Sequence, residues 1–301
     1  MKGCLICIPC TLRAAYDMAA KATDKEELQK RVVAETLKWL SENGRIMNLT
    51  PTILHTHVFK LVQKITGNND PFAHLKRESN KIAMNLIPLL KNEFEKLSFA
   101  ESFKFAALGA ICGNSIDFEV EGYNVSLEEI EESLLGCLRS ELAIDDTSKL
   151  MEVLSKSNLV LYLLDNAGEV AFDKFFISVI TSRYPVRVFA AVKSGPILND
   201  ATIDDALQVG LDEVAEVITT GSDSIGLNLE ECSEDFRKLL EEVDVLIAKG
   251  QGYYESVTEI EHIIRKPIVY MLRAKCSPVA KSLNVRQGSN IVKIANYNHC
   301  E

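Results

Sequence analysis

Oxygen-bearing side chains follow two apolar segments in the second half of the chain. Asp165 and Asn166 come directly after the apolar run 159–164. Asp200 lies in the loop that follows the apolar run 186–192. Carboxylate and amide oxygens are hard ligands of the kind that Mg²⁺ and Mn²⁺ prefer, with water completing the coordination. These three residues therefore predict a divalent-metal site.

Three further loops follow apolar runs and carry groups that bind phosphate. Ser222 follows the run 214–219, Lys249 follows the run 243–248, and the last of these loops is 273–276. A lysine and backbone N–H donors beside a hard metal are a usual arrangement for phosphoryl transfer. Each loop alone could be an ordinary helix cap. All five loops together favour a functional site.

The elements that would position these residues change character near residue 155. Apolar residues recur with a helical period in the first part of the chain, and we expect helices over 24–40, 51–66, 71–90 and 99–111. Further on, apolar runs alternate with helical stretches, which is typical of a mostly parallel sheet covered on both faces. The sequence therefore predicts an α/β fold with three α/β/α layers. We expect a mainly helical region over 1–155 and an α/β metal-binding catalytic region over 156–301.

The five loops would then share one edge of the molecule. Parallel strands end at the same edge of their sheet, and ligands of open α/β sheets bind outside the carboxyl ends of the strands. We therefore expect the oxygen ligands and the lysine loop to lie close together.

The chain is acidic, with a formal net charge of −10 over 301 residues. It has no block of basic residues, so we expect no binding of nucleic acid through phosphate neutralisation. No apolar run reaches the roughly 18 residues that cross a bilayer, and the start lacks a signal-peptide pattern. We therefore expect a cytoplasmic protein with no membrane partner, and a homo-oligomer is a possible state.

Three of the eight cysteines, Cys4, Cys7 and Cys10, form a C-x2-C-x2-C pattern. In an intracellular protein such a cluster suggests metal or redox chemistry before structural disulfides. A structural zinc site requires four ligands, and no obvious fourth lies nearby in the sequence. Reduced cysteines packed at the start of a helix are an equally good interpretation.

The chain also resembles the metal-dependent damage-control phosphatases, over almost its whole length. The segments that carry the resemblance are 7–10, 113–117, 165–169, 195–202, 249–252 with Glu255, and 273–276. The paired N-terminal cysteines are similar to those of the prokaryotic, stand-alone subfamily. The combination of D-N-x-G-E with K-G-x-P-x-x-N-D is fairly specific, although Ser194 here separates Lys193 from Gly195.

The resemblance implies roles for particular residues. It implies binding of Mn²⁺, Mg²⁺, Co²⁺ or Ni²⁺ by Asp165, Asn166 and Asp200. It implies contact with the phosphate or the rest of the substrate near Asn114, Asp117 and Lys249. We include two more candidates for substrate binding from the same motifs and loops, Glu169 and Ser222.

The predicted function is metal-dependent hydrolysis of small phosphate monoesters. Sugar phosphates are one candidate class, and damaged phospho-metabolites are a second that only the resemblance implies. Asp165 would activate water or act as the nucleophile, and Lys249 would hold phosphate oxygens. Tyr253 stands where family members usually have Asn, which bears on the choice of substrate.

Two alternatives belong to other functional classes. A carboxyl methyltransferase that uses S-adenosylmethionine is compatible with a parallel sheet, but the loop 165–169 has one glycine and an acidic face. Neither G-x-x-x-x-G-K-[ST] nor G-x-G-x-x-G follows the first of these apolar runs. A non-catalytic metal or redox module would be centred on the three N-terminal cysteines.

Overall fold

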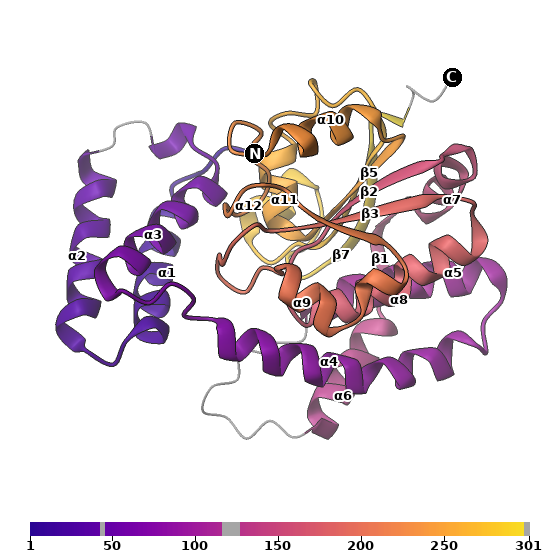
Figure 1. Cartoon of the computed structure of the whole chain (residues 1–301), viewed down its shortest axis with the longest axis horizontal. Helices are drawn as coiled ribbons and strands as arrows, with labels where there is room; N and C mark the ends of the chain where they lie inside the picture. The colour runs from indigo at the N-terminus through magenta and orange to yellow at the C-terminus, as the bar shows by residue number, and fades with distance from the viewer. Residues whose placement is uncertain (43–45, 116–126, 298–301) are drawn as a thin grey trace.

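A computed structural model describes residues 1–42, 46–115 and 127–297 and contains a seven-stranded sheet (Figure 1). The strand order is β1-β7-β6-β5-β2-β3-β4. The five strands from β6 to β4 are parallel, whereas β7 is antiparallel to β6 and parallel to β1. The strands are β1 Leu142–Asp145, β2 Leu159–Leu163, β3 Arg187–Val192, β4 Glu216–Thr219, β5 Val245–Lys249, β6 Ile268–Arg273 and β7 Asn290–Ala295.

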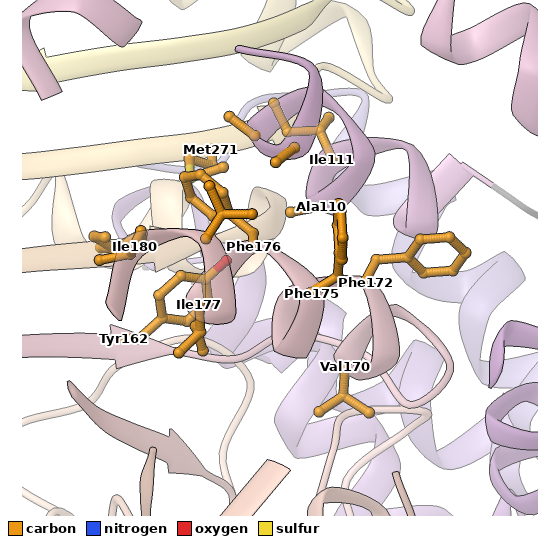
Figure 2. Close-up of a cluster of buried hydrophobic side chains, with 14 of the residues drawn as sticks. Ala110, Ile111, Tyr162, Val170, Phe172, Phe175, Phe176, Ile177, Ile180 and Met271 are labelled. Atoms are coloured by element: carbon orange, nitrogen blue, oxygen red, sulfur yellow. The ribbon is translucent and has the colours of Figure 1, made fainter. Parts of the chain in front are cut away.

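Side chains of the central strands alternate between two apolar cores, because successive residues of a strand point to opposite faces. In β2, Val160 and Tyr162 belong to one core, and Leu161 and Leu163 belong to the other. Figure 2 shows part of the first core, in which aromatic and aliphatic side chains of α8 gather around Tyr162. Helices thus cover both faces of the sheet, and the predicted three-layer α/β fold is confirmed.

Each face has its own set of helices. The first core is formed with α4 Ala73–Phe94, α5 Phe99–Cys112, α6 Leu127–Leu138, α7 Thr147–Lys156, α8 Glu169–Arg183 and α9 Ile203–Gln208. The second core is formed with α10 Glu234–Glu242, α11 Gly250–Val257 and α12 Ser277–Ser282.

The first three helices form a separate group beside the sheet (Figure 1). They are α1 Cys7–Ala22, α2 Glu26–Glu42 and α3 Pro51–Thr66. Helix α3 begins with Pro51, whose missing N–H is not needed in the first turn, and ends at Gly67 in the left-handed conformation. Val32, Val58 and Phe59 are fully buried in the small core of this group, which Ile197 of the β3–α9 loop also joins.

Strand β1 was not expected from the sequence. Its four residues are too few for apolar alternation to distinguish a strand from a loop. Since β1 pairs with β7, the sheet includes residues from both sides of the expected division at residue 155. The antiparallel direction of β7 was also not anticipated, and it arises because β7 returns directly beside β6.

Two of the cysteines outside the N-terminal cluster are paired. Cys112 at the end of α5 forms a disulfide with Cys137 on α6. In the described part of the chain, no helix has the length and apolar character to cross a membrane.

Candidate metal-binding active site

The candidate site lies where the loops after β2 and β3 meet, at the carboxyl ends of these neighbouring strands. A short antiparallel bridge joins Asn166 to Asp200. Beside it, the backbone N–H of Ala201 donates a hydrogen bond to the carbonyl oxygen of Asp165 (2.8 Å). Backbone pairing of the two loops thus brings the three expected metal ligands together.

Asp165 is held by side-chain amides on one of its two oxygens. The Nδ2 atoms of Asn114 (2.6 Å) and Asn166 (3.0 Å) both donate to Oδ2, and Oδ1 accepts no hydrogen bond from the described residues. Burial raises the pKa of this carboxyl, while the positive charges of Lys275 and Lys249 act to lower it. The two amides therefore fix the carboxylate and leave Oδ1 available.

Asp200 is a buried acid with an unsatisfied oxygen. Within the described residues its Oδ2 has no hydrogen-bond partner, and the nearest cation is the Nζ atom of Lys193 at 3.7 Å. Burial raises the pKa of Asp200 to about 7, the charge of Lys193 opposes this change, and the charge of Asp165 adds to it. The carboxylate thus has a poorly compensated charge.

These features fit a hard divalent cation. The Oδ1 atom of Asn114 is also buried and without a donor among the described residues, beside Asp165. Unsatisfied buried oxygens and two neighbouring carboxylates are costly unless a positive charge compensates them. An oxygen-only donor set suits Mg²⁺ or Mn²⁺ better than a soft metal.

Glu169 and Lys249 belong to a buried ion network behind these ligands. The Nζ atom of Lys249 donates to Oε1 of Glu169 (2.5 Å), Oδ1 of Asp173 (2.7 Å) and the carbonyl oxygen of Ala110 (2.8 Å). The Oε2 atom of Glu169 lies 3.4 Å from both the backbone nitrogen and Nδ2 of Asn166. Burial raises the pKa of Glu169 to about 8, and the charge of Lys249 opposes that change.

This network revises the expected role of Lys249. An ammonium group has three N–H donors, and all three are engaged here. In this arrangement Lys249 has no donor for a phosphate oxygen. It instead fixes Glu169, which in turn contacts the candidate ligand Asn166.

The other expected substrate contacts lie in different places. Asp117 lies outside the described residues. The hydroxyl of Ser222 donates to Oε2 of Glu231 (2.9 Å) and forms no hydrogen bond with Asp165 or Asp200. Tyr253 is fully buried, with its ring facing the ammonium of Lys193.

Lys275 is a site residue that sequence reasoning did not single out. It is exposed, and its ammonium pairs with no carboxylate in the part of the chain that the structure describes. Among the groups that lower the pKa of Asp165, its charge comes first. The sequence signal was its position in the loop after β6, but the pattern could not show which lysine stays free.

A cavity of about 360 Å³ lies beside the site loops, between the helical group and α11. Glu255 is a carboxylate in its wall, and none of the described lysine or arginine side chains lines it. Leu198, Gln251, Gly252 and Cys276 come from the site loops, and Cys7, Cys10 and His55 come from α1 and α3.

The N-terminal cysteines do not form a metal centre in this structure. In the described ranges, no three His, Cys, Asp or Glu side chains are grouped so that they could hold a metal ion. The Sγ atoms of Cys4 and Cys7 are 3.7 Å apart, as unbonded thiols. Burial raises the pKa of Cys7 to about 11, which disfavours the reactive thiolate. All three cysteines are unpaired thiols, of which Cys7 is buried, Cys4 is half-buried and Cys10 is exposed.

Comparison with known proteins identifies relatives along the whole chain. Residues 5–291 match the family described as the damage-control phosphatase ARMT1-like domain. A damage-control phosphatase of Archaeoglobus fulgidus is 36% identical over 98% of this chain and 99% of its own length. The damage-control phosphatase PH1575 of Pyrococcus horikoshii is 34% identical over 94% of each chain. These matches confirm the resemblance seen in the sequence motifs.

A solved structure confirms the fold. The crystal structure of a DUF89 family protein from Pyrococcus horikoshii superimposes with a TM-score of 0.87 at 34% identity. The match covers 97% of this chain and 98% of the other. An uncharacterised protein of Methanocaldococcus jannaschii is 40% identical over 95% of this chain and 93% of its own length.

Proposed function

This chain belongs to the damage-control phosphatase family, and from that premise we propose that it hydrolyses small phosphate monoesters with a divalent cation held by Asp165, Asn166 and Asp200. Membership of this family supports phosphatase activity. The proposal adds the metal ligands and the class of substrate.

The observation that carries the metal assignment is that two carboxylate oxygens, Oδ2 of Asp200 and Oδ1 of Asp165, accept no hydrogen bond from the described residues. A hard cation bound there would polarise a phosphate oxygen and offset the charge that develops during hydrolysis. Mg²⁺ and Mn²⁺ are the first candidates, and Co²⁺ and Ni²⁺ are alternatives for the same oxygen donors.

Three side chains have separate roles in the proposed reaction. Lys275 is free to hold phosphate oxygens, because its ammonium has no other partner among the described residues. The Oδ1 atom of Asp165 delivers the nucleophile, either by accepting a proton from water or by attacking phosphorus itself. In both routes the phosphorus–oxygen ester bond breaks and the leaving alkoxide takes up a proton. In the first route this proton is the one that Asp165 took from the attacking water; in the second it comes from solvent water, and a further water then hydrolyses the aspartyl phosphate to release phosphate and regenerate the carboxylate. Asn114 keeps Oδ1 directed at the reaction by binding Oδ2.

The cavity beside the site suits the organic part of the ester. It has room for a molecule of sugar size, and among the described residues its wall has no lysine or arginine for a second phosphate. The terminal ammonium of Met1, which also lines it, is paired with Glu259. The carboxylate of Glu255 can accept hydrogen bonds from substrate hydroxyl groups. These features support a neutral polyol or sugar monophosphate as the substrate class.

Phosphate release from a panel of sugar monophosphates, measured with Mg²⁺, Mn²⁺, Co²⁺ and Ni²⁺, tests the proposal. Asp200→Asn should lower both turnover and Mn²⁺ affinity by roughly 100-fold, because it removes a ligand charge. The control is Asp204→Asn, which removes an equal charge from an exposed position in the following helix. It should behave as the wild type.

The same assay tests the phosphate ligand. Lys275→Met should raise KM roughly tenfold without weakening Mn²⁺ binding, because the phosphate contact is lost and the positive charge that is removed near Asp165 does not favour a bound cation. Normal metal-dependent turnover by Asp200→Asn would refute the metal site, and an unchanged KM for Lys275→Met would refute the role of the lysine.

A further inference from the structure

Lys193 is a buried cation with few polar partners. It lies at the end of β3, and its side chain is fully buried. Its Nζ atom donates to the carbonyl oxygen of Gly226 (2.6 Å), and Oδ2 of Asp200 lies 3.7 Å away. Lys249, which is equally buried, has three close oxygen partners. Lys193 therefore lacks part of the polar shell that a buried ammonium requires.

The ring of Tyr253 occupies the position of the missing partner. The Nζ atom of Lys193 is 4.3 Å from the ring centroid, within the range of a cation–π contact. Tyr253 is fully buried on α11, and its hydroxyl has no hydrogen-bond partner among the described residues. Among the described residues, no hydrogen bond of the hydroxyl holds this side chain in place. The face of the ring, by contrast, contacts the ammonium of Lys193.

In the described part of the chain, the contact that links the ring to the candidate metal site is the one with Lys193. Tyr253 does not line the cavity beside the site and forms no hydrogen bond with Asp165 or Asp200. Lys193 is the nearest cation to the unsatisfied oxygen of Asp200. The position of its ammonium thus affects the orientation of this carboxylate.

We propose that Tyr253 is a positioning residue whose aromatic face holds the ammonium of Lys193 beside Asp200 and so fixes that carboxylate for metal binding. The inference rests on the proposed function, because it assigns a role toward the same cation. In this role the π face of Tyr253 contacts the ammonium, and the hydroxyl is not required.

Mn²⁺ binding to the full-length protein, measured by calorimetry without substrate, tests this role. Tyr253→Phe keeps the ring and should bind Mn²⁺ within about twofold of the wild type. Tyr253→Leu removes the ring and should weaken binding roughly tenfold, as is typical for residues that support a metal ligand. At saturating Mn²⁺, the KM for the phosphate ester should be unchanged in both variants.

A second series separates the cation–π contact from folding and size. Phenylalanine analogues with one, two and three fluorine atoms at position 253 keep the shape of the ring but weaken its negative face. Mn²⁺ affinity should fall stepwise along this series, and the thermal midpoint should fall only slightly, because the ring keeps its volume while the cation–π contact weakens.

The failures of the two proposals can be distinguished. If the wild type and all fluorinated proteins bind Mn²⁺ equally well, or if Tyr253→Phe loses as much affinity as Tyr253→Leu, the role of the ring is refuted and the metal site stands. If the wild type binds no divalent ion, the metal site itself is refuted, and this inference with it.

Discussion

Gly250 allows the backbone after β5 to pass directly against the candidate metal ligand Asp165. A Cβ atom at this position would lie 1.8 Å from Oδ2 of Asp165, which no side-chain adjustment can absorb while that carboxylate stays in place. Its φ of +75° also lies in the left-handed region, which favours glycine. Gly250 is therefore required for the position of the Asp165 carboxylate as well as for the conformation of the turn.

We predict that Gly250→Ala displaces Asp165 and lowers kcat roughly 100-fold, as small displacements of catalytic groups do. Gly67→Ala is the matched control, because Gly67 has the same φ of +75° and no atom within 4 Å of its added Cβ. Gly67→Ala should lower the free energy of unfolding by about 1–2 kcal/mol. Gly250→Ala should lower it further, because the added Cβ also displaces Asp165. Thermal unfolding and phosphate-release assays measure the two effects, and equal activity losses in both variants would contradict the prediction.

Helices α5 and α6 are joined by the Cys112–Cys137 disulfide just before the segment that carries Asn114. Asn114 lies two residues after Cys112, in the short 3₁₀ turn Gly113–Ser115. Gly113 packs so closely on α8 that an added Cβ would lie 2.6 Å from the ring of Phe172. The disulfide and this close packing together hold the amide that binds Asp165.

Loss of the disulfide should destabilise the protein. The two cysteines are 25 residues apart, and closing a loop of this length removes unfolded-state entropy worth about 3.5 kcal/mol at 25 °C. The Cys112→Ala/Cys137→Ala variant should lose roughly this free energy of unfolding in urea titrations. A reductant should produce a similar loss in the wild type and no further loss in the variant. An unchanged wild-type midpoint in reductant would contradict the prediction.

The two parts of the helical N-terminal half have different roles in the molecule (Figure 1). Helices α1–α3 have their own small core beside the sheet. Helices α4–α6, by contrast, help to cover one face of the sheet, where Leu90, Phe103, Ala107 and Leu134 are buried against α8 and the strands. The α/β half is therefore incomplete without residues from the first half.

We predict that residues 156–301 alone do not fold, because this fragment lacks β1, α5 and α7 and exposes the core under them. Residues 71–301 should keep the sheet, since only the separate helical group is removed. Circular dichroism during thermal unfolding checks both fragments, with a cooperative transition expected for 71–301 alone. A cooperative transition in 156–301 would show that the α/β half is an independent domain.

The loops that carry the candidate site could be located from the sequence, because each follows a buried strand directly. Asp165, Asn166 and Asp200 lie in the loops that follow two neighbouring parallel strands, and parallel order places the ends of such strands at one edge of the sheet. The α/β class and the family followed from the same local patterns. The four-residue strand β1 did not, since so short a segment has no measurable period.

The environments of the lysines and of Tyr253 could be determined only from the tertiary structure. Lys249 contacts Asp173, which lies 76 residues away in the sequence. This buried contact distinguishes Lys249 from Lys275, which is exposed. Tyr253 contacts Lys193 in the same way, from the helix that follows a different strand. Burial and ion pairing depend on which distant side chains share a space, and apolar periodicity describes only the near neighbours along the chain. For that reason the sequence determined where the chemistry lies, whereas the packing of the helices on the sheet determined which charged groups are free to perform it.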